Sequence, residues 1–401
     1  MNVHLNILYA SSEDVSLGNG PGANERDFIR TLYQQVGQQA HFVIPTPAHP
    51  VADLPVSACT FCKPHHNHHP IHFAAHMFSL ARKVRRQLSS REFDILVLRL
   101  DVLPLAPQVI VRRHRTPYAL KTLSQASILA LEQRPVLHRL LFSRLNVELF
   151  RSLVSGAAMT DVCSQAMIRF FAERLTLPED RFVWIDNAVD TSRFVPTAVA
   201  PAREQIGLTD FNPIVGYVGQ RPWERGARQL VEIAPRLLAE YPRLGVLVVG
   251  GGPDLTSLVK LAEDLGVSDR CVIVGQVPFD SVPLYCNALD VGVSINVHSD
   301  RFAAAELKVR QYLACGKPVV ASGGSNDFLV SHQLGTIVDP SDSFQVERAV
   351  RQWLTTSSEE RRDFAARARR FVHEHLSYAA AVQRRLALWS ELLGSENHRA
   401  R

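Results

Sequence analysis

The best candidate for an anion site is the start of a helix that we expect over Ala304–Ala314. Gly316 can close this helix in a left-handed turn, and Pro318 just beyond cannot extend it. The first turn of a helix offers unpaired N–H groups and a positive dipole end, and Lys308 adds a cation there. The pattern therefore predicts phosphate binding at positions 303–308.

Two apolar strands must hold this helix in place. Val291–Asn296 precedes it and Val319–Ala321 follows it, which gives the order strand, loop, helix, strand. In an open parallel sheet the loop after a strand lies at the carboxyl edge, where ligands bind. We therefore expect the phosphate site at the carboxyl edge of a parallel sheet.

A second group of cations lies in the turn Gly219–Gly226, directly after the apolar strand Ile214–Gly219. It holds Gln220, Arg221 and Arg225. The planar fork of an arginine suits phosphate oxygens. A surface loop with solvated arginines is the alternative interpretation.

A glycine-rich segment, Gly18–Gly22, lies between a first strand over Leu5–Ala10 and a helix over Ala23–Val36. Glycines such as Gly20 and Gly22 let the backbone approach a ligand closely, and the helix behind them points its N-terminus the same way. No convincing acidic residue ends a second strand, which argues against a dinucleotide-binding dehydrogenase.

Apolar strands alternate with amphipathic helices in two successive runs, which predicts an α/β fold of two Rossmann-like domains with parallel sheets facing a cleft. The proline-containing stretch Thr191–Pro213 reads as a linker. We expect domains at 1–195 and 196–375 and a final helical segment at 376–401. The remaining strands are expected at His41–Pro45, Phe93–Leu100, Tyr118–Leu123, Met159–Cys163, Phe182–Ile185, Leu244–Val249 and Cys271–Gly275, and further helices at Phe73–Leu88, Ala227–Tyr241 and Leu255–Leu265.

The composition is that of a globular protein. The chain has 401 residues, 46% of them hydrophobic and 21% charged. No apolar run reaches the roughly 18 residues that a membrane helix needs. The first residues read as a buried strand rather than a signal peptide, and six scattered cysteines do not form a disulfide framework. We therefore expect a cytoplasmic protein.

The net charge of +5 is modest, but basic residues cluster at Arg82–Arg86 and Arg112–Arg115. One interpretation is a solvated helix face. The other is an anionic partner, either a phosphorylated molecule or a membrane surface with a lipid-linked one, where the protein would bind peripherally at the inner face. No recognition motif accompanies the charge, which argues against nucleic acid.

Histidines are concentrated in one segment: six of the 16 lie between positions 65 and 76, after Cys59 and Cys62. Such a group could bind zinc. The spacing fits no standard zinc finger, however, and Pro64 and Pro70 indicate a loop. We rank a polar loop facing the acceptor first and expect no metal.

The segment Tyr312–Ala321, YLACGKPVVA, resembles the donor-sugar motif of the family-four retaining glycosyltransferases, which have the GT-B fold. The family's two glutamates would fall on Ala303 and Gln311. Leu307-Lys308 and the following residues resemble a branch of the family with Pro-Leu-Lys-x-x-Glu-Tyr. Gln311 can still accept a hydrogen bond from a ribose hydroxyl.

The resemblance implies a role for each candidate. The turn at 219–226 matches the family's Gly-Arg-x-x-x-x-Lys-Gly, so that Arg225 replaces the Lys and Gln220 the Arg, with Arg221 close by. Residues assigned to donor binding are Gly20, Gly22, Gly219, Gln220, Arg221, Gln276, Val277, Glu306 and Leu307, and the catalytic group is Arg225, Lys308 and Gln311. The activity implied is retaining transfer from a nucleotide sugar, such as a UDP- or GDP-sugar, to a glycan, lipid-linked or small-molecule acceptor.

Two alternatives stay open. A nucleotide-sugar epimerase would need a carboxylate near the sugar, with Glu306 or Asp300 as candidates. A non-catalytic partner subunit is suggested by the two missing glutamates. The family's first-domain histidine would fall on Leu123, and Lys121 is a nearby cation. The last helix, Tyr378–Leu393, would cross back to the first domain, as in the GT-B fold.

Overall fold

The computed structural model describes residues 4–17, 20–64, 70–99, 105–112, 114–121, 136–297 and 306–399. Its contacts divide the chain into two compact units. Met1–Asp186 together with Tyr378–Arg401 make the first, and Asn187–Ser377 make the second. The final helix therefore belongs with the N-terminal part of the chain.

The first unit is built on a seven-stranded sheet in the order β3-β2-β1-β4-β5-β6-β7, and every pairing is parallel. Its strands are β1 (Ile7–Ala10), β2 (Ala40–Pro45), β3 (Cys59–Cys62), β4 (Ile95–Arg99), β5 (Tyr118–Lys121), β6 (Met159–Val162) and β7 (Phe182–Trp184). The edge strand β3 was not predicted, because its only pairing is with β2 and its residues are mostly half-buried.

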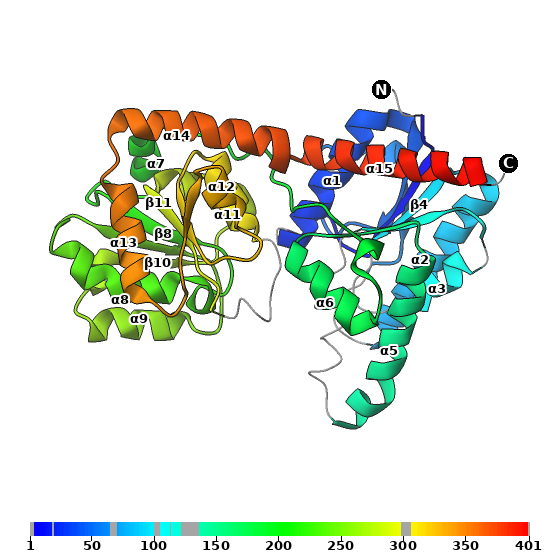
Figure 1. Ribbon diagram of the computed structural model, residues 1–401, viewed down its shortest axis with the longest axis horizontal. Coiled ribbons are helices and arrows are strands. Elements are labelled where there is room, and N and C mark those ends of the chain that lie inside the picture. The colour runs from blue at the N-terminus through cyan, green and yellow to red at the C-terminus, as the bar shows by residue number, and fades with distance from the viewer. Residues whose placement is uncertain are drawn as a thin grey trace. The chain divides into compact units, whose positions relative to one another are not determined.

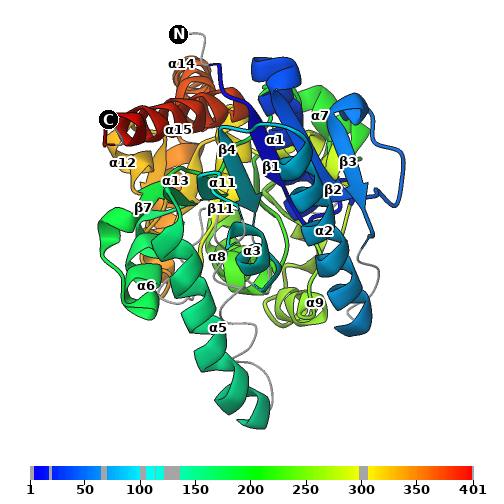
Figure 2. The ribbon, with the colours of Figure 1, turned by 90° about the vertical axis from the view of Figure 1, so that its right-hand side faces the viewer.

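The helices of this unit are α1 (Gly20–Val36), α2 (Pro70–Ser90), α3 (Leu105–Val111), α5 (Val136–Gly156), α6 (Gln165–Leu175) and α15 (Tyr378–Arg399). Helix α1 packs against α15, and α2 packs against α3 (Figures 1 and 2). A buried ion pair between Arg385 and Asp161, 2.7 Å long, joins α15 to β6. Trp389 of α15 is fully buried, so this helix is part of the first unit's core.

The second unit contains a six-stranded parallel sheet in the order β10-β9-β8-β11-β12-β13. Its strands are β8 (Ile214–Val218), β9 (Gly245–Val249), β10 (Cys271–Gly275), β11 (Val291–Ser294), β12 (Val319–Ala321) and β13 (Gly335–Ile337). Its helices are α7 (Val199–Gln205), α8 (Ala227–Leu238), α9 (Leu255–Asp264), α10 (Val282–Ala288), α11 (Leu307–Ala314), α12 (Phe328–Ser331), α13 (Ser343–Leu354) and α14 (Ser358–Phe371).

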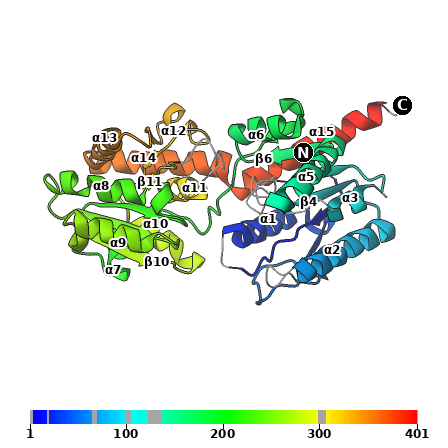
Figure 3. The same cartoon turned by 90° about the horizontal axis from the view of Figure 1, so that it is seen from below.

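Helices cover both faces of this sheet. Val215 and Tyr217 of β8 pack with α8, α9 and α13, which lie together in Figure 3, while Ile214 and Val218 pack with α10, α11 and α14. Neighbouring residues of a strand point to opposite faces, so a sheet covered on both sides needs continuous apolar strands. The stretch 191–213, expected to be a linker, instead contains α7 and buries Phe194 in this core.

No helix in the described ranges is long and apolar enough to cross a membrane. All six cysteines are free.

Candidate functional site

The loops that follow β8, β9 and β10 meet at the carboxyl edge of the second unit's sheet. The N–H of Gly250 donates to the carbonyl of Gly275 at 2.7 Å, and the N–H of Arg221 donates to that of Gly251 at 2.9 Å. Gly250 has a φ of +135°, and a Cβ atom there would lie 1.7 Å from the carbonyl oxygen of Gly219. Glycine is therefore required at 250, because a side chain would push these loops apart.

Gly219 has a second neighbour, the side chain of Lys308. A Cβ atom at Gly219 would lie 2.6 Å from Cε of Lys308, so the missing side chain leaves the space that the lysine stem occupies. The Lys308 ammonium lies 5.1 Å from the ring centroid of Tyr217, which attracts it electrostatically. The predicted cation at the start of α11 is thus held against the end of β8.

Four side chains gather beside this lysine. Arg225 donates to one oxygen of the Glu306 carboxylate, Lys308 lies 3.7 Å from the same oxygen, and the Ser294 hydroxyl donates to the other oxygen. We call Ser294, Arg225, Glu306 and Lys308 the Glu306 cluster. It joins β11, the turn after β8 and the start of α11, and it carries one net positive charge.

Ser294 and Glu306 are buried and the two cations are partly buried, and the charges of the cluster shift one another's pKa. Burial alone would raise the pKa of Glu306, but Lys308 and Arg225 outweigh burial and lower that pKa. Burial lowers the pKa of Lys308, and Glu306 opposes this shift. Glu306 is therefore an ionised counter-ion, and it is poorly suited to act as the proton-accepting carboxylate of an epimerase.

Helix α11 begins at Leu307, with Glu306 as its N-cap, rather than at Ala304. Lys308 and Gln311 are three residues apart on it and so share one face. Gln311 is buried. Ala303 and Asp300 lie outside the described residues.

The helix is anchored by a residue that sequence reasoning missed. Arg310 is fully buried and donates to Asn326 at 2.8 Å and to the carbonyl of Ser325 at 3.1 Å. Arg310 lies on α11 between the candidates Lys308 and Gln311. Nothing in the sequence, however, distinguishes this buried arginine from one on the surface. Ser294 was missed for the same reason.

The other donor-side candidates are spread along the same edge. A Cβ atom on Gly251 would lie 3.3 Å from the side-chain oxygens of both Gln220 and Gln276, which are exposed. Val277 packs partly into the core. Arg221 is 54% exposed and pairs with Glu224 at 3.6 Å, so it does not join the Glu306 cluster here.

In the first unit, Gly20 and Gly22 lie in the first turn of α1 and not in a loop. Glycine and proline predict a loop, but Pro21 fits a first helical turn, where its missing N–H is not needed. Gly18 lies outside the described residues.

The same helix places Glu25 in a buried charge cluster at the carboxyl ends of β1, β4 and β5. Its carboxylate accepts hydrogen bonds from Tyr9, from Arg99 and, at 3.1 Å, from Lys121. Burial alone would raise the pKa of Glu25, but Arg99 and Lys121 outweigh it and bring the pKa to about 2. Burial lowers the pKa of Lys121 to about 8. For Lys121 we expected a structural lysine at the cleft edge, with a cation near the acceptor as the alternative, and no role was predicted for Glu25.

The cysteine and histidine segment is only partly described, since 65–69 lie outside the described ranges. Burial raises the pKa of both Cys59 and Cys62 to about 12, which disfavours the thiolates that bind zinc. Nδ1 of His76 lies 2.6 Å from the carbonyl of Lys63. Within the described part of the chain, no three His, Cys, Asp or Glu side chains are arranged to hold a metal ion.

Comparison with known proteins agrees with this geometry. Residues 200–371 match the family model of glycosyl transferases group 1. A GDP-mannose-dependent alpha-(1-6)-phosphatidylinositol monomannoside mannosyltransferase of Mycolicibacterium smegmatis is 33% identical over 217 residues, 49% of this chain and 55% of that protein. A 2-deoxystreptamine N-acetyl-D-glucosaminyltransferase of Streptomyces fradiae is 31% identical over 198 residues, 47% and 46% of the two chains. The chain thus spans about half the length of the curated relatives it matches.

Solved structures establish the fold. Sucrose-phosphate synthase from Thermosynechococcus elongatus superposes with a TM-score of 0.72 at 18% identity, over 97% of this chain and 99% of that one. HepE from Anabaena, in complex with UDP and glucose, gives a TM-score of 0.68 at 17% identity, over 96% and 100%. Residues 200–371 thus match the family model of the group 1 glycosyltransferases, and the two parallel sheets have the arrangement of the GT-B fold.

Proposed function

We propose that the protein transfers a sugar, with retention of anomeric configuration, from a nucleotide-sugar donor to a glycan, lipid-linked or small-molecule acceptor. The observation that carries this proposal is the convergence of Arg225 and Lys308 on one carboxylate, with Gln311 on the same face of α11. Two cations that already bind one anion provide a place for the phosphates of a donor.

In this proposal the donor diphosphate competes with Glu306 for Arg225 and Lys308. The bond between the anomeric carbon and the diphosphate oxygen breaks, and the charge that develops on that oxygen is stabilised by the two side chains. The acceptor attacks from the face that the diphosphate leaves, and a phosphate oxygen takes the acceptor's proton. A divalent metal is not needed for this step, since the cations are side chains.

Gln311 contacts the ribose hydroxyls of the donor. The backbone around Gln276 and Val277 holds the base, and such contacts do not select between UDP and GDP donors. The names of the two relatives mention GDP-mannose and an N-acetyl-D-glucosaminyl group. These names support a hexose donor, and they do not identify the hexose. Their named acceptors differ from each other, which leaves the acceptor class open. The basic face of α2 supports an anionic or membrane-bound acceptor.

The test is turnover by the full-length protein with UDP- and GDP-linked hexoses, with EDTA present. We expect slow donor hydrolysis without an acceptor, and Arg225→Ala to lower kcat/KM by about 100-fold or more, as loss of a transition-state charge contact does. The matched control is Arg228→Ala, whose side chain pairs with Glu232 at 2.7 Å on the exposed face of α8.

The product's anomeric configuration, read by NMR, tests retention directly. Inverted product would contradict the proposed mechanism but not the donor site. Conversion of the donor sugar without its release would favour an epimerase. A failure to bind any nucleotide sugar would favour a non-catalytic subunit.

A further inference from the structure

The second unit holds a cavity of about 520 Å³ at the amino edge of its sheet. Lys317 stands just before β12 and Asp290 just before β11, and both line the cavity. The Glu306 cluster lies at the start of α11, beyond the carboxyl end of β11. The cavity is therefore separate from the proposed donor site.

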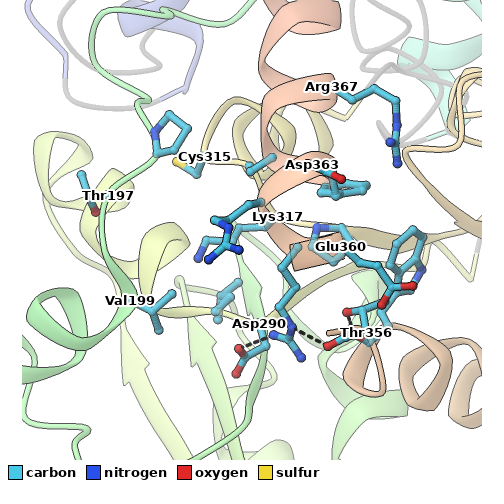
Figure 4. A pocket seen from close by; sticks show the side chains of 18 of the residues that line it. Thr197, Val199, Asp290, Cys315, Lys317, Thr356, Glu360, Asp363 and Arg367 are labelled. Carbon is cyan, nitrogen blue, oxygen red and sulfur yellow. Dashed lines mark hydrogen bonds and ion pairs between the residues drawn. The ribbon is translucent and has the colours of Figure 1, made fainter. Parts of the chain in front are cut away.

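Apolar side chains line the cavity beside charged ones such as Asp290, Lys317 and Glu360 (Figure 4). Val199 of α7, Trp353 of α13 and Phe364 of α14 line it. The rings of Trp353 and Phe364 meet edge to face, with centroids 5.2 Å apart and planes at 66°. Aromatic walls of this kind suit a ring-sized apolar group.

Lys317 is a buried cation that forms no ion pair among the described residues, while Asp290 of the same cavity attracts its charge at longer range. Lys317 is 7% exposed, and none of the hydrogen bonds or ion pairs among the described residues involves its ammonium group. The neighbouring carboxylate, Asp290, is already engaged by Arg203 at 2.5 Å, Arg361 at 2.7 Å and the N–H of Ile214 at 2.7 Å. A buried ammonium group is costly unless an anion accompanies it.

The position of this lysine is fixed by close packing. Gly316 has a φ of +69°, and a Cβ atom there would lie 2.7 Å from Cβ of Ala365 in α14. Burial lowers the pKa of Lys317 to about 8, so the group is still largely protonated at neutral pH. The ammonium group is thus a preformed binding element.

We propose that this cavity binds a small monocarboxylate that carries an apolar ring. The carboxylate pairs with Lys317, and the ring packs against Trp353 and Phe364. The lining holds four cationic side chains and three carboxylates, so one positive charge is uncompensated. This balance fits a monoanion better than inorganic phosphate, which is largely dianionic above neutral pH.

The probes are phenylacetate and its neutral counterpart phenylacetamide, added to the full-length protein labelled with ¹⁵N. The protein has four tryptophans, so its indole N–H signals can be assigned by substitution. The indole of Trp353 donates to Thr336 at 3.0 Å and reports on the cavity. Trp223 lies in the same turn as Arg225 and reports on the donor site.

We expect phenylacetate to shift the Trp353 signal and leave the Trp223 signal in place, and phenylacetamide to bind at least tenfold more weakly. Lys317→Met is expected to remove this preference. Thr197→Trp changes an exposed residue at the cavity and leaves Lys317 in place, so it tests the site without removing a buried charge. Lys260→Met, at an exposed lysine of α9, is the matched control and is expected to bind like the unaltered protein.

Several results would overturn the proposal. One is equal affinity for phenylacetate and phenylacetamide, and another is unchanged phenylacetate binding by Lys317→Met. The others are a shift of the Trp223 signal alone, or no shift of the Trp353 signal at millimolar phenylacetate. A stronger Trp353 response to inorganic phosphate than to phenylacetate would refute the assigned ligand class. Circular dichroism of each variant separates lost binding from lost folding.

Discussion

At the scale of single residues, Glu306 decides how available the donor cations are. Its ionised carboxylate holds Arg225 and Lys308 when no donor is present. In the proposed mechanism a donor phosphate therefore displaces a carboxylate rather than water. This contact keeps Arg225 and Lys308 paired in the free protein. A ligand must therefore carry a strong negative charge to displace the Glu306 carboxylate from them.

We expect Glu306→Gln to tighten the binding of UDP or GDP by about tenfold, because a neutral amide competes less well for the two cations. The same substitution is expected to lower the melting temperature of the ligand-free protein, since two partly buried cations lose their partner. Calorimetric titration and thermal unfolding measure the two effects.

Glu224→Gln is the matched control for this substitution, because Glu224 pairs only with the exposed Arg221. Glu224→Gln is expected to change neither the nucleotide affinity nor the melting temperature much. Weaker nucleotide binding by Glu306→Gln would mean that the carboxylate orients Arg225 for the donor instead of competing with it.

Glu25 in the first unit predicts a pH dependence of stability. The carboxyl group has a pKa of about 2 in the folded state against an ordinary 4.5, so the folded state binds fewer protons between these values. The free energy of unfolding therefore rises with pH across this window, and the contribution of Glu25 is lost as the pH falls towards 2.

Urea unfolding of the unaltered protein and of Glu25→Gln, between pH 5 and pH 2, checks this expectation. The two proteins are expected to differ most at the upper end and to converge at the lower end. Asp254→Asn serves as the control, because this carboxylate stands at the start of α9 in the second unit, outside the charge cluster around Glu25. A difference that is constant with pH would contradict the role of Glu25.

At the scale of elements, the hydrophobic pattern predicted the strands that are buried on both faces. The strand at Cys271–Gly275 was predicted to the residue, and that at Ile214–Gly219 extends one residue too far. Several of the missed elements are short or lie at a sheet edge, among them β3, β13, α7, α10 and α12. Such segments are held by a few tertiary contacts, and their composition differs little from that of loops.

The candidate site was also predicted only in part. Arg225 and Lys308 were singled out in a turn and a helix start that follow strong strands, and all three candidates, Gln311 included, by resemblance to the family's motifs. The sequence did not reveal that Glu306 pairs with two of them. Pairing between residues 81 positions apart depends on how β8, β11 and α11 come together, which no local pattern encodes.

At the scale of the whole molecule, the final helix links the two ends of the sequence in one unit. Arg385 of α15 and Asp161 of β6 form an ion pair that is almost completely buried, with side chains 5% and 0% exposed. Removing one partner of such a pair leaves a buried charge unpaired, which costs about 3–5 kcal/mol. The chain's C-terminal segment is thus required for the stability of its N-terminal sheet.

We expect Arg385→Met to lower the unfolding temperature of the first unit while the second unit keeps its own transition. Nucleotide binding raises the stability of the unit that holds the Glu306 cluster, so added UDP or GDP is expected to shift only that second transition. Differential scanning calorimetry with and without nucleotide separates the two unfolding transitions.

Arg228→Met is the control, because it removes an exposed ion pair and is expected to lower the stability by only about 0.5 kcal/mol. Equal shifts of both transitions in Arg385→Met would show that α15 stabilises the two units together, and would contradict its assignment to the first.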